Sequence, residues 1–217
     1  MGEKIKKDDI IKALLDMAFA HSTSGTSLSD IAGALGIKKA SLYNHFESRE
    51  DLILRTTESC AEYLASISFI PADIDSVAKR YPPETVLKGI VSRYIKMHEK
   101  SPLFQIYTFI ESQKYFSPEA AKIIKDEREK ITAQTCKVFE ALLEAGTVSV
   151  KKELIPDAAQ WFCSGVCDIM SIHLLERKKI VMENPKSGEG ELFTLSGDDS
   201  SLDRINSLSE SFSQLLK

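Results

Sequence analysis

The chain has 217 residues, of which 43% are hydrophobic and 28% charged, and a formal net charge of −4. This length allows one large domain, or a small and a medium domain, and the composition is ordinary for a soluble globular protein. No apolar run is long enough to span a bilayer, and the charged N-terminus lacks the apolar stretch of a secretory signal, which together predict a cytoplasmic protein with no membrane partner.

Helical periodicity dominates the sequence and no segment alternates convincingly as a strand does, so we expect an all-α fold. The first helix is expected to begin near Asp8, with a buried stripe that starts at Ile11. The segment 183–200 is polar and rich in Gly and Ser; we interpret it, with Gly188 and Gly190, as a flexible connection and not as part of a phosphate loop. Further helices are expected at residues 28–35, 38–46, 49–70, 83–100, 118–146, 156–179 and 202–215, with room for a short helical piece between 71 and 82, and residues 103–116 form a run rich in aromatic side chains.

Residues 27–46 have the pattern of two short helices joined by a tight turn. Ser27 is a good N-cap, and Asp30 stands three residues later, at the capping-box position. Gly36 follows the last apolar residue of the first helix, where glycine can adopt a positive φ at little cost. Leu42 and Phe46 are one turn apart and face inward in the second helix. The pattern predicts a helix-turn-helix, which places a helix in the DNA major groove.

The charge distribution does not by itself indicate a nucleic-acid binder. Residues 1–50 hold seven basic and seven acidic side chains, so this region is neutral. If the helix-turn-helix binds DNA, its affinity must depend on where a few charged groups point, because the overall field does not supply it.

The segment from Gly36 to Leu52, GIKKASLYNHFESREDL, resembles the signature of the tetracycline-repressor (TetR) family. The glycine, the Leu-Tyr and His-Phe pairs and the basic residue before an acidic helix start all agree, as do Ile10 to Phe19 and Ser27 to Ala32. The resemblance covers roughly the first quarter of the chain. It implies an all-α protein with a three-helix DNA-binding domain at 1–52 and a larger helical domain for ligand binding and dimerisation at 53–217.

The resemblance also implies which side chains contact DNA. Phosphate contacts are expected from Ser27, Tyr43, His45 and Arg49. Base contacts are expected from Lys39, Ser41 and Asn44, since lysine can pair with guanine, asparagine with adenine and serine with several bases. The complete expected surface is Ser27, Ser29, Lys38, Lys39, Ser41, Tyr43, Asn44, His45 and Arg49.

The sequence departs from the family pattern at three places. The loop between Phe19 and Ser27 is shorter than usual and lacks the customary Gly-aromatic pair. Arg49 stands where lysine is usual. The third helix begins with Lys38 and Lys39, where a small capping residue is common.

The second domain is expected to bind a small-molecule effector. Its aromatic and soft apolar side chains suit a mostly apolar cavity with a few polar anchors, and hence an apolar or aromatic effector. Packing in an ordinary core is the competing interpretation. The candidate ligand-binding residues are Tyr94, His98, Phe104, Tyr107, Glu111, Trp161 and Met170.

The helices expected at 156–180 and 201–217 have more apolar surface than one protomer needs, and the family resemblance also implies a homodimer. A single helix-turn-helix of this size contacts few base pairs. It binds a specific DNA site when two copies contact half-sites that are one or more turns of the DNA helix apart. We therefore expect an isologous interface formed by these helices. Its candidate residues are Val166, Leu174, Ile205, Leu208 and Phe212.

The cysteines Cys60, Cys136, Cys163 and Cys167 are too few for a disulfide scaffold. Cys163 and Cys167 are one helical turn apart and fit either a metal or redox pair or small core residues. An enzyme that uses Cys163 or His173 is the competing class of function, but no nucleophile–base pair has a telling spacing. We expect no catalytic group, metal or cofactor.

These observations predict a cytoplasmic, homodimeric transcriptional regulator, most simply a repressor. It would bind a near-palindromic double-stranded DNA operator and be released by a small molecule, with the long helix after Ser48 as the lever between the domains. A helix-turn-helix kept only for protein contacts is the third class.

Overall fold

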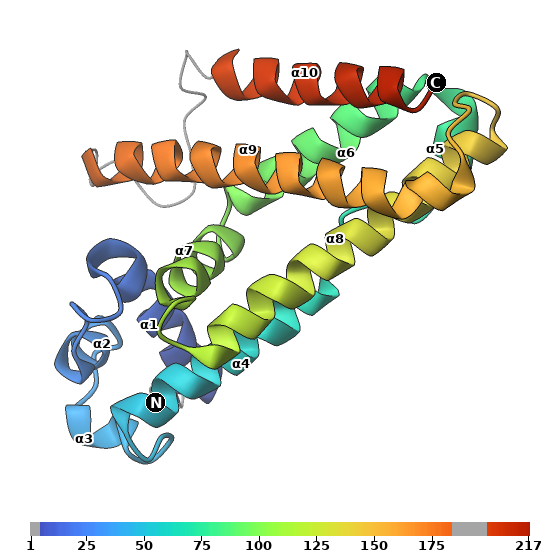
Figure 1. The fold of residues 1–217 in the computed structure, drawn as a ribbon. Helices are drawn as coiled ribbons and strands as arrows, with labels where there is room; N and C mark the ends of the chain where they lie inside the picture. Colours follow the sequence, from blue (N-terminus) through green and yellow to red (C-terminus); the bar gives the residue numbers. More distant parts are fainter. Residues whose placement is uncertain (1–4, 184–198) are drawn as a thin grey trace. The chain divides into compact units, whose positions relative to one another are not determined.

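The structure, a computed structural model, describes residues 5–183 and 199–217. Gly188 and Gly190 and nearly all of the expected connection at 183–200 lie outside this part of the chain. The described part holds no strand, so the all-α expectation is confirmed. Its α-helices are α1 Lys7–His21, α2 Leu28–Ala34, α3 Lys39–Leu42, α4 Arg49–Ser66, α5 Ile74–Arg80, α6 Pro83–His98, α7 Leu103–Gln113, α8 Pro118–Glu144, α9 Ile155–Glu183 and α10 Asp199–Leu215 (Figure 1).

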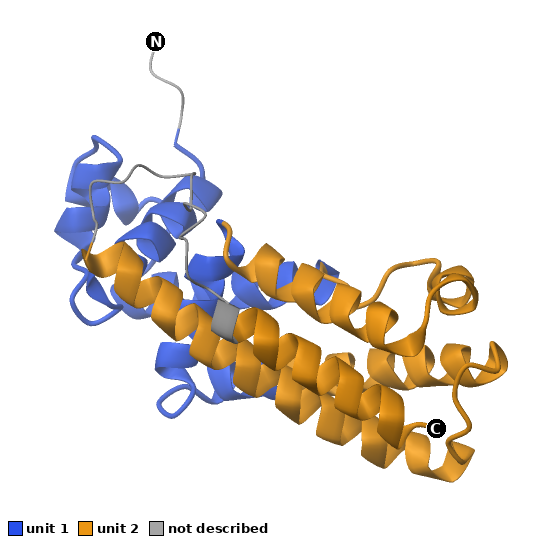
Figure 2. Cartoon of the chain, turned by 90° about the horizontal axis from the view of Figure 1, so that it is seen from above, with its two compact units in different colours: residues 1–66, 101–125 blue, residues 67–100, 126–217 orange. Residues whose placement is uncertain are grey.

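The helices form two compact units, each made of two stretches of chain (Figure 2). Unit 1 comprises residues 1–66 and 101–125, and unit 2 comprises 67–100 and 126–217. None of the described helices is both long and apolar enough to cross a membrane.

This division differs from the expected boundary at residue 52, which lies inside α4. The helix expected to continue to Ile70 ends at Ser66, and all of α4 belongs to unit 1. α8 is instead the helix that contributes residues to both units. The difference arises because α7 packs against α1 and α4, a long-range contact that no local pattern indicates.

The core of unit 1 forms around α1, which packs against α2, α4 and α7. Ile10 and Leu14 lie one turn apart on its inner face, and neither is more than 2% exposed. Ile10, and not the expected Ile11, begins the buried stripe. The ring of Phe19 meets Phe104 of α7 edge-on, with centroids 4.9 Å apart, a geometry that aromatic pairs prefer. This contact joins residues 101–125 to the N-terminal helices.

In unit 2, α10 packs against α6 and α9 through a face that carries serines. Ser209 and Ser213 are at most 3% exposed, and they share this face with Ile205 and Phe212. The Ser209 hydroxyl donates to the Ile205 carbonyl at 2.7 Å, so it is satisfied within its own helix. Small side chains let two helix backbones approach closely.

A glycine sets the approach of α9 to α10. A Cβ atom on Gly165 would lie only 2.7 Å from Cδ1 of Leu208. Because the serine face of α10 turns inward, Leu202 is 43% and Leu215 71% exposed. Of the apolar residues on this helix, Ile205 and Phe212 are buried within the protomer, while those at its two ends are not.

An aromatic cluster fills the space between α8, α9 and α10. Phe162 lies edge-on to both Phe139 and Phe212, with ring centroids 5.8 and 5.1 Å apart. All three side chains are at most 9% exposed. This cluster and the serine face explain why the last helix is part of the unit 2 core.

His173 links three helices of unit 2. Its Nδ1 lies 2.8 Å from the Ser201 hydroxyl, and its Nε2 contacts the Glu99 carboxylate. Burial would raise the pKa of Glu99, but the hydrogen bond and charge of His173, together with Arg177, bring it below its ordinary value. Since both ring nitrogens hold neighbouring helices, the structure gives His173 a structural role, in place of the catalytic one weighed from the sequence.

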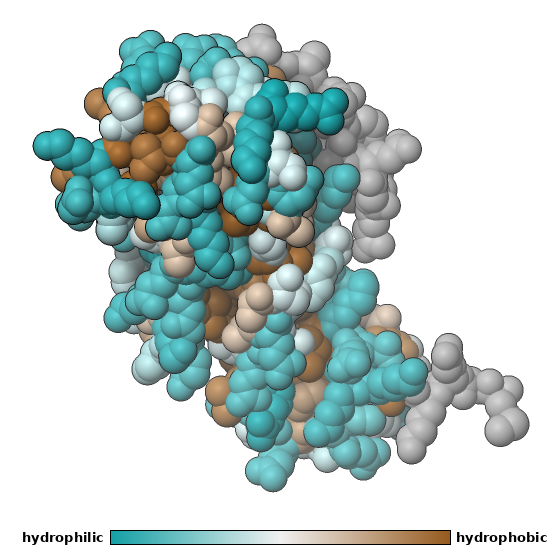
Figure 3. All heavy atoms as spheres, turned by 90° about the vertical axis from the view of Figure 1, so that its right-hand side faces the viewer, coloured by the Kyte–Doolittle hydropathy of each residue, from teal (hydrophilic) through white to brown (hydrophobic). Residues whose placement is uncertain are grey.

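Apolar groups also reach the surface. On the face drawn in Figure 3, they form separate groups among hydrophilic side chains. The large apolar side chains that are more than 60% exposed are Tyr115, Phe116, Trp161, Leu175, Met182 and Leu215.

Candidate nucleic-acid interface

The predicted capping box at the start of α2 is present. The Ser27 hydroxyl oxygen accepts from the Asp30 N–H at 3.2 Å, and the Asp30 carboxylate accepts from the Ser27 N–H at 2.8 Å. These bonds from Ser27 lower the pKa of Asp30, which keeps a negative charge at the positive end of the helix. The Ser27 O–H group can still donate to an anion outside the helix.

The predicted glycine turn follows α2. Gly36 has φ of 65°, and its N–H donates to the Gly33 carbonyl at 3.1 Å. The Ile37 N–H reaches the Ala32 carbonyl at 2.9 Å and satisfies a second carbonyl at the end of α2. A Cβ on Gly36 would meet no atom within 4 Å, so the turn requires glycine for its backbone angle and not for space.

Two alanine substitutions in this segment should shift stability in opposite directions. Gly36→Ala should lower the free energy of unfolding by about 1 kcal/mol, because alanine is strained at this φ. Gly33→Ala is the matched control: it lies within α2 with open space around a Cβ, and alanine there should raise stability by up to about 1 kcal/mol. Urea unfolding midpoints measure both changes, and a shift of the same sign for both would contradict the assigned turn.

α3 is shorter than expected. It spans only Lys39–Leu42, and the chain then continues as a turn to Phe46. The Asn44 and His45 N–H groups bond the carbonyls three residues back, at 3.3 and 2.9 Å, which tightens the helix into this turn. Leu42 and Phe46 are buried as predicted, at 2% and 4% exposure. The side chains between them are therefore presented on the outside.

All nine predicted DNA-contacting residues lie at the surface of unit 1. Tyr43 is 52% exposed, although it is a large aromatic residue. Three of the nine, Ser41, His45 and Arg49, are half-buried. The exposed ones are Ser27, Ser29, Lys38, Lys39, Tyr43 and Asn44. The structure thus brings the set together around α2, α3 and the start of α4, and their contact with DNA stays a prediction.

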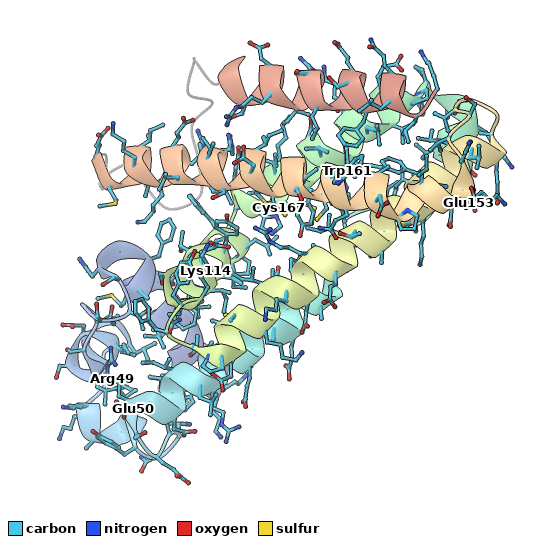
Figure 4. All side chains as sticks on the ribbon, viewed as in Figure 1. Arg49, Glu50, Lys114, Glu153, Trp161 and Cys167 are labelled. Carbon is cyan, nitrogen blue, oxygen red and sulfur yellow. The ribbon has the colours of Figure 1, made fainter. Side chains whose placement is uncertain are left out.

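Arg49 has a structural role that sequence reasoning missed. Its guanidinium donates to the carbonyl of Thr23 at 2.5 Å and to that of Thr26 at 3.3 Å (Figure 4). The arginine therefore ties the first residue of α4 to the loop between α1 and α2. The sequence holds a signal for this structural role: the loop before Ser27 is shorter than usual, and the usual lysine at position 49 is replaced by arginine.

The shortened loop is tightly built. Ser22 has φ of 69°, and its carbonyl accepts from the Thr26 hydroxyl at 2.8 Å. A Cβ on Gly25 would lie 2.2 Å from the carbonyl oxygen of His21, so only glycine fits there. The bonds from Arg49 and the fit of Gly25 hold α1 and α2 in place without the usual aromatic residue.

The candidate ligand-binding residues are divided between the two units. Phe104, Tyr107 and Glu111 belong to unit 1, where Phe104 packs on Phe19 and Glu111 pairs with Lys114 at 2.6 Å. In unit 2, Tyr94, His98 and Met170 are buried, whereas Trp161 is 67% exposed (Figure 4). Tyr94 donates to the Glu127 carboxylate, and the His98 ring bonds the Tyr94 carbonyl at 2.9 Å.

Most of the candidate dimer residues are buried within a single protomer. Val166, Leu174, Ile205 and Phe212 are at most 9% exposed, and Leu208 is half-buried beside Gly165. These side chains hold α9 and α10 in the unit 2 core. A second copy can reach only their exposed neighbours on the same helices.

A capped α2, a glycine turn and an exposed short α3, followed by a larger set of helices, define a helix-turn-helix protein of the regulator class. Residues 10–56 match the model of the family described as bacterial regulatory proteins, tetR family. This match lies in the N-terminal segment that resembles the TetR family in the sequence, so the predicted resemblance is confirmed for residues 10–56.

Curated relatives resemble the N-terminal part of the chain. It is 39% identical over 61 residues to the biofilm operon icaADBC HTH-type negative transcriptional regulator IcaR of Staphylococcus aureus (strain Newman). It is 37% identical over 57 residues to the IcaR of Staphylococcus epidermidis. These matches cover 28% and 26% of this chain and 33% and 31% of the relatives, so the chain spans about a third of the length of the proteins it matches.

Solved structures share the whole fold. A transcriptional regulator from Rhodococcus sp. Rha1 superposes with a TM-score of 0.61 at 13% identity, over 97% of both chains. A TetR transcription regulator from Haloarcula marismortui gives 0.61 at 12% identity, again over 97% of both chains. A putative transcriptional regulator from Saccharomonospora viridis, in complex with choline, gives 0.57 at 11% identity, over 96% of this chain and 95% of that one. At these identities the likeness concerns the fold alone.

Proposed function

We propose that this protein is a cytoplasmic repressor of transcription that binds a near-palindromic DNA operator as a homodimer and is released by a small molecule. The observation that carries the proposal is the exposed polar surface around α2 and α3. It is presented by a capped helix and a glycine turn within the segment that matches the family model. The negative regulator IcaR, similar over the same region, supports repression over activation.

Five of the surface residues divide by chemistry into two groups. Lys39, Ser41 and Asn44 lie on α3 or just after it and reach toward base edges, which they can distinguish by hydrogen bonding. Tyr43 and His45 lie beside them and bond phosphates, which positions the helix without reading sequence. Residues 1–50 carry no net charge, so the domain neutralises few DNA phosphates. Its affinity for DNA therefore depends on the positions of the few side chains that contact the operator.

The proposed dimer interface uses the exposed faces of α9 and α10. Trp161, Leu175 and Met182 lie on one face of α9 at multiples of seven residues, with the exposed Asp168 at the position between the first two, and each of the three is more than 60% exposed. Leu208 and Leu215 have the same spacing on α10. A seven-residue apolar repeat is the pattern by which helices pair along a seam. Two copies of α9 and α10 would then form a four-helix bundle, with the buried residues of the original set supporting it from inside.

The proposed effector binds in unit 2, where a buried polar cluster interrupts the apolar core. Tyr94, Glu127 and His98 form this cluster between α6 and α8. The bound choline in the structural neighbour from Saccharomonospora viridis supports a small-molecule role for this fold. An effector acts by binding more tightly to the conformation that does not fit the operator.

A gel-shift assay with the DNA upstream of the protein's own gene tests the proposal. Wild-type protein should retard one fragment, and log affinity should fall linearly with log salt. Tyr43→Ala should weaken binding to all sequences alike, whereas Asn44→Ala should lose about 1–3 kcal/mol of preference at one base pair. If wild type retards no fragment more strongly than random DNA, or if both variants bind like wild type, the assigned surface is wrong.

A further inference from the structure

Two thiols lie one turn apart on the side of α9 that faces α8. The sulfur atoms of Cys163 and Cys167 are 3.9 Å apart, and the Cys163 thiol donates to the carbonyl of Arg128 at 3.5 Å. Cys163 is 1% exposed, whereas Cys167 is half-buried. A reagent from solvent would therefore meet Cys167 first.

The surroundings favour one thiolate within the pair. A hydrogen bond from Cys167 lowers the pKa of Cys163, and the Thr132 hydroxyl and the positive charge of Arg128 act in the same direction. The same bond to Cys163, together with burial, raises the pKa of Cys167. The first proton is thus lost from Cys163, while Cys167 keeps its own and donates it to the thiolate. Thiolates are the form that binds soft metals and metalloids.

The spacing disfavours a disulfide and favours a bridging atom. A disulfide needs Cβ atoms about 3.8 Å apart, whereas side chains one turn apart on a helix hold them at about 5–6 Å. Bonds of about 2.3 Å at a tetrahedral angle place two sulfurs about 3.8 Å apart, and a linear centre places them about 4.6 Å apart. At the narrower angles of a pyramidal trivalent centre the same bonds hold the sulfurs about 3.3–3.8 Å apart. The observed 3.9 Å is therefore close enough for one atom to bond both sulfurs after a small side-chain adjustment.

The number of protein ligands near the two thiols determines which kind of atom can bind them. Within the described part of the chain, no group of three or more His, Cys, Asp and Glu side chains could hold a metal ion. A centre bound here must therefore bring its other substituents with it. A trivalent organoarsenical does so, since it carries one carbon substituent and takes two sulfurs, and thiolates are the soft ligands it prefers.

We propose that Cys163 and Cys167 form a two-thiol site for a trivalent arsenical. In the reaction with phenylarsine oxide, each thiol gives up its proton and two As–S bonds form. The two protons and the oxygen of the As=O group leave as water, and the arsenic remains trivalent, so no oxidant is consumed. This site does not depend on the proposed DNA-binding function.

The test treats the full-length protein with phenylarsine oxide in an excess of a monothiol, removes free reagent by gel filtration and counts arsenic per chain. Wild type should keep one arsenic, because the second As–S bond forms within the molecule, and should lose it to a competing dithiol. Cys167→Ser and Cys163→Ala should each lower retention about a hundredfold, since one thiol cannot compete with the monothiol. Circular dichroism confirms that each variant remains helical.

Cys136→Ser is the matched control, because Cys136 is a half-buried thiol on α8 outside the pair. It should retain arsenic like wild type. Equal retention by wild type and Cys167→Ser, or no retention by wild type, would overturn the site. If peroxide converts the pair quantitatively to an internal disulfide in folded protein, the preference for a bridging atom is wrong.

Discussion

Leu175→Glu is expected to convert the dimer into monomers and to lower operator affinity about a hundredfold or more. Leu175 is 70% exposed in the single protomer and lies seven residues from Met182 and fourteen from Trp161 on the same face of α9. A glutamate there would place two like charges in a desolvated seam, which costs far more than a surface charge does. Linking two half-site contacts typically raises affinity by about 10²–10⁴, and that gain is lost with the dimer.

Light scattering of the purified protein measures this change, and Leu154→Glu is its control. Leu154 is also exposed, at 52%, but it lies in the short helix before α9 and not on the repeat. The control should remain dimeric and bind operator normally. If the Leu175→Glu protein is still dimeric, this face of α9 is not the dimer interface. Phe212 is a poorer choice for this test, because it is buried in its own protomer and its loss would disturb folding.

Arg49→Gln should destabilise unit 1 by about 1–3 kcal/mol, because it leaves the part-buried carbonyls of Thr23 and Thr26 without their charged donor. Operator affinity should fall as well, since α2 and α4 lose their link. The salt dependence separates two roles of Arg49. If it positions the loop, the slope of log affinity against log salt stays unchanged; if it neutralises one phosphate, the slope falls by about 0.9.

Arg55→Gln provides the comparison for Arg49. Arg55 lies on the same helix, is exposed and pairs with Asp51 and Glu58. Surface pairs of this kind contribute at most about 1 kcal/mol, so thermal unfolding should change little. Equal destabilisation by both substitutions would show that the Arg49 tether is no stronger than an ordinary surface pair.

The helix-turn-helix was predictable because its determinants are local. The bonds between Ser27 and Asp30 and the positive φ of Gly36 depend on residues within one turn of each other. Such chemistry can be read directly from spacing. The inward position of Leu42 and Phe46 follows from the same short-range register, even though α3 proved to be shorter than expected.

The parts that escaped prediction depend on distant partners. Arg49 and Thr23 are 26 residues apart, and the edge-on contact of Phe19 with Phe104 joins segments from opposite sides of α4 to α6 in the sequence. A serine face rarely indicates a core, so Ser209 and Ser213 gave no sign that α10 would turn its leucines outward. For this reason the burial of Ile205 and Phe212 within the protomer could not be read from the sequence.

α8 runs without interruption from Pro118 to Glu144, and the division between the units falls after residue 125. The hydrogen bonds of an α-helix run along its whole length, so residues 118–144 form one continuous element. Arg128, whose carbonyl accepts a hydrogen bond from the Cys163 thiol, lies less than one turn beyond that division. The thiol of α9 therefore binds the unit 2 part of α8 close to the residue at which the same helix passes into unit 1.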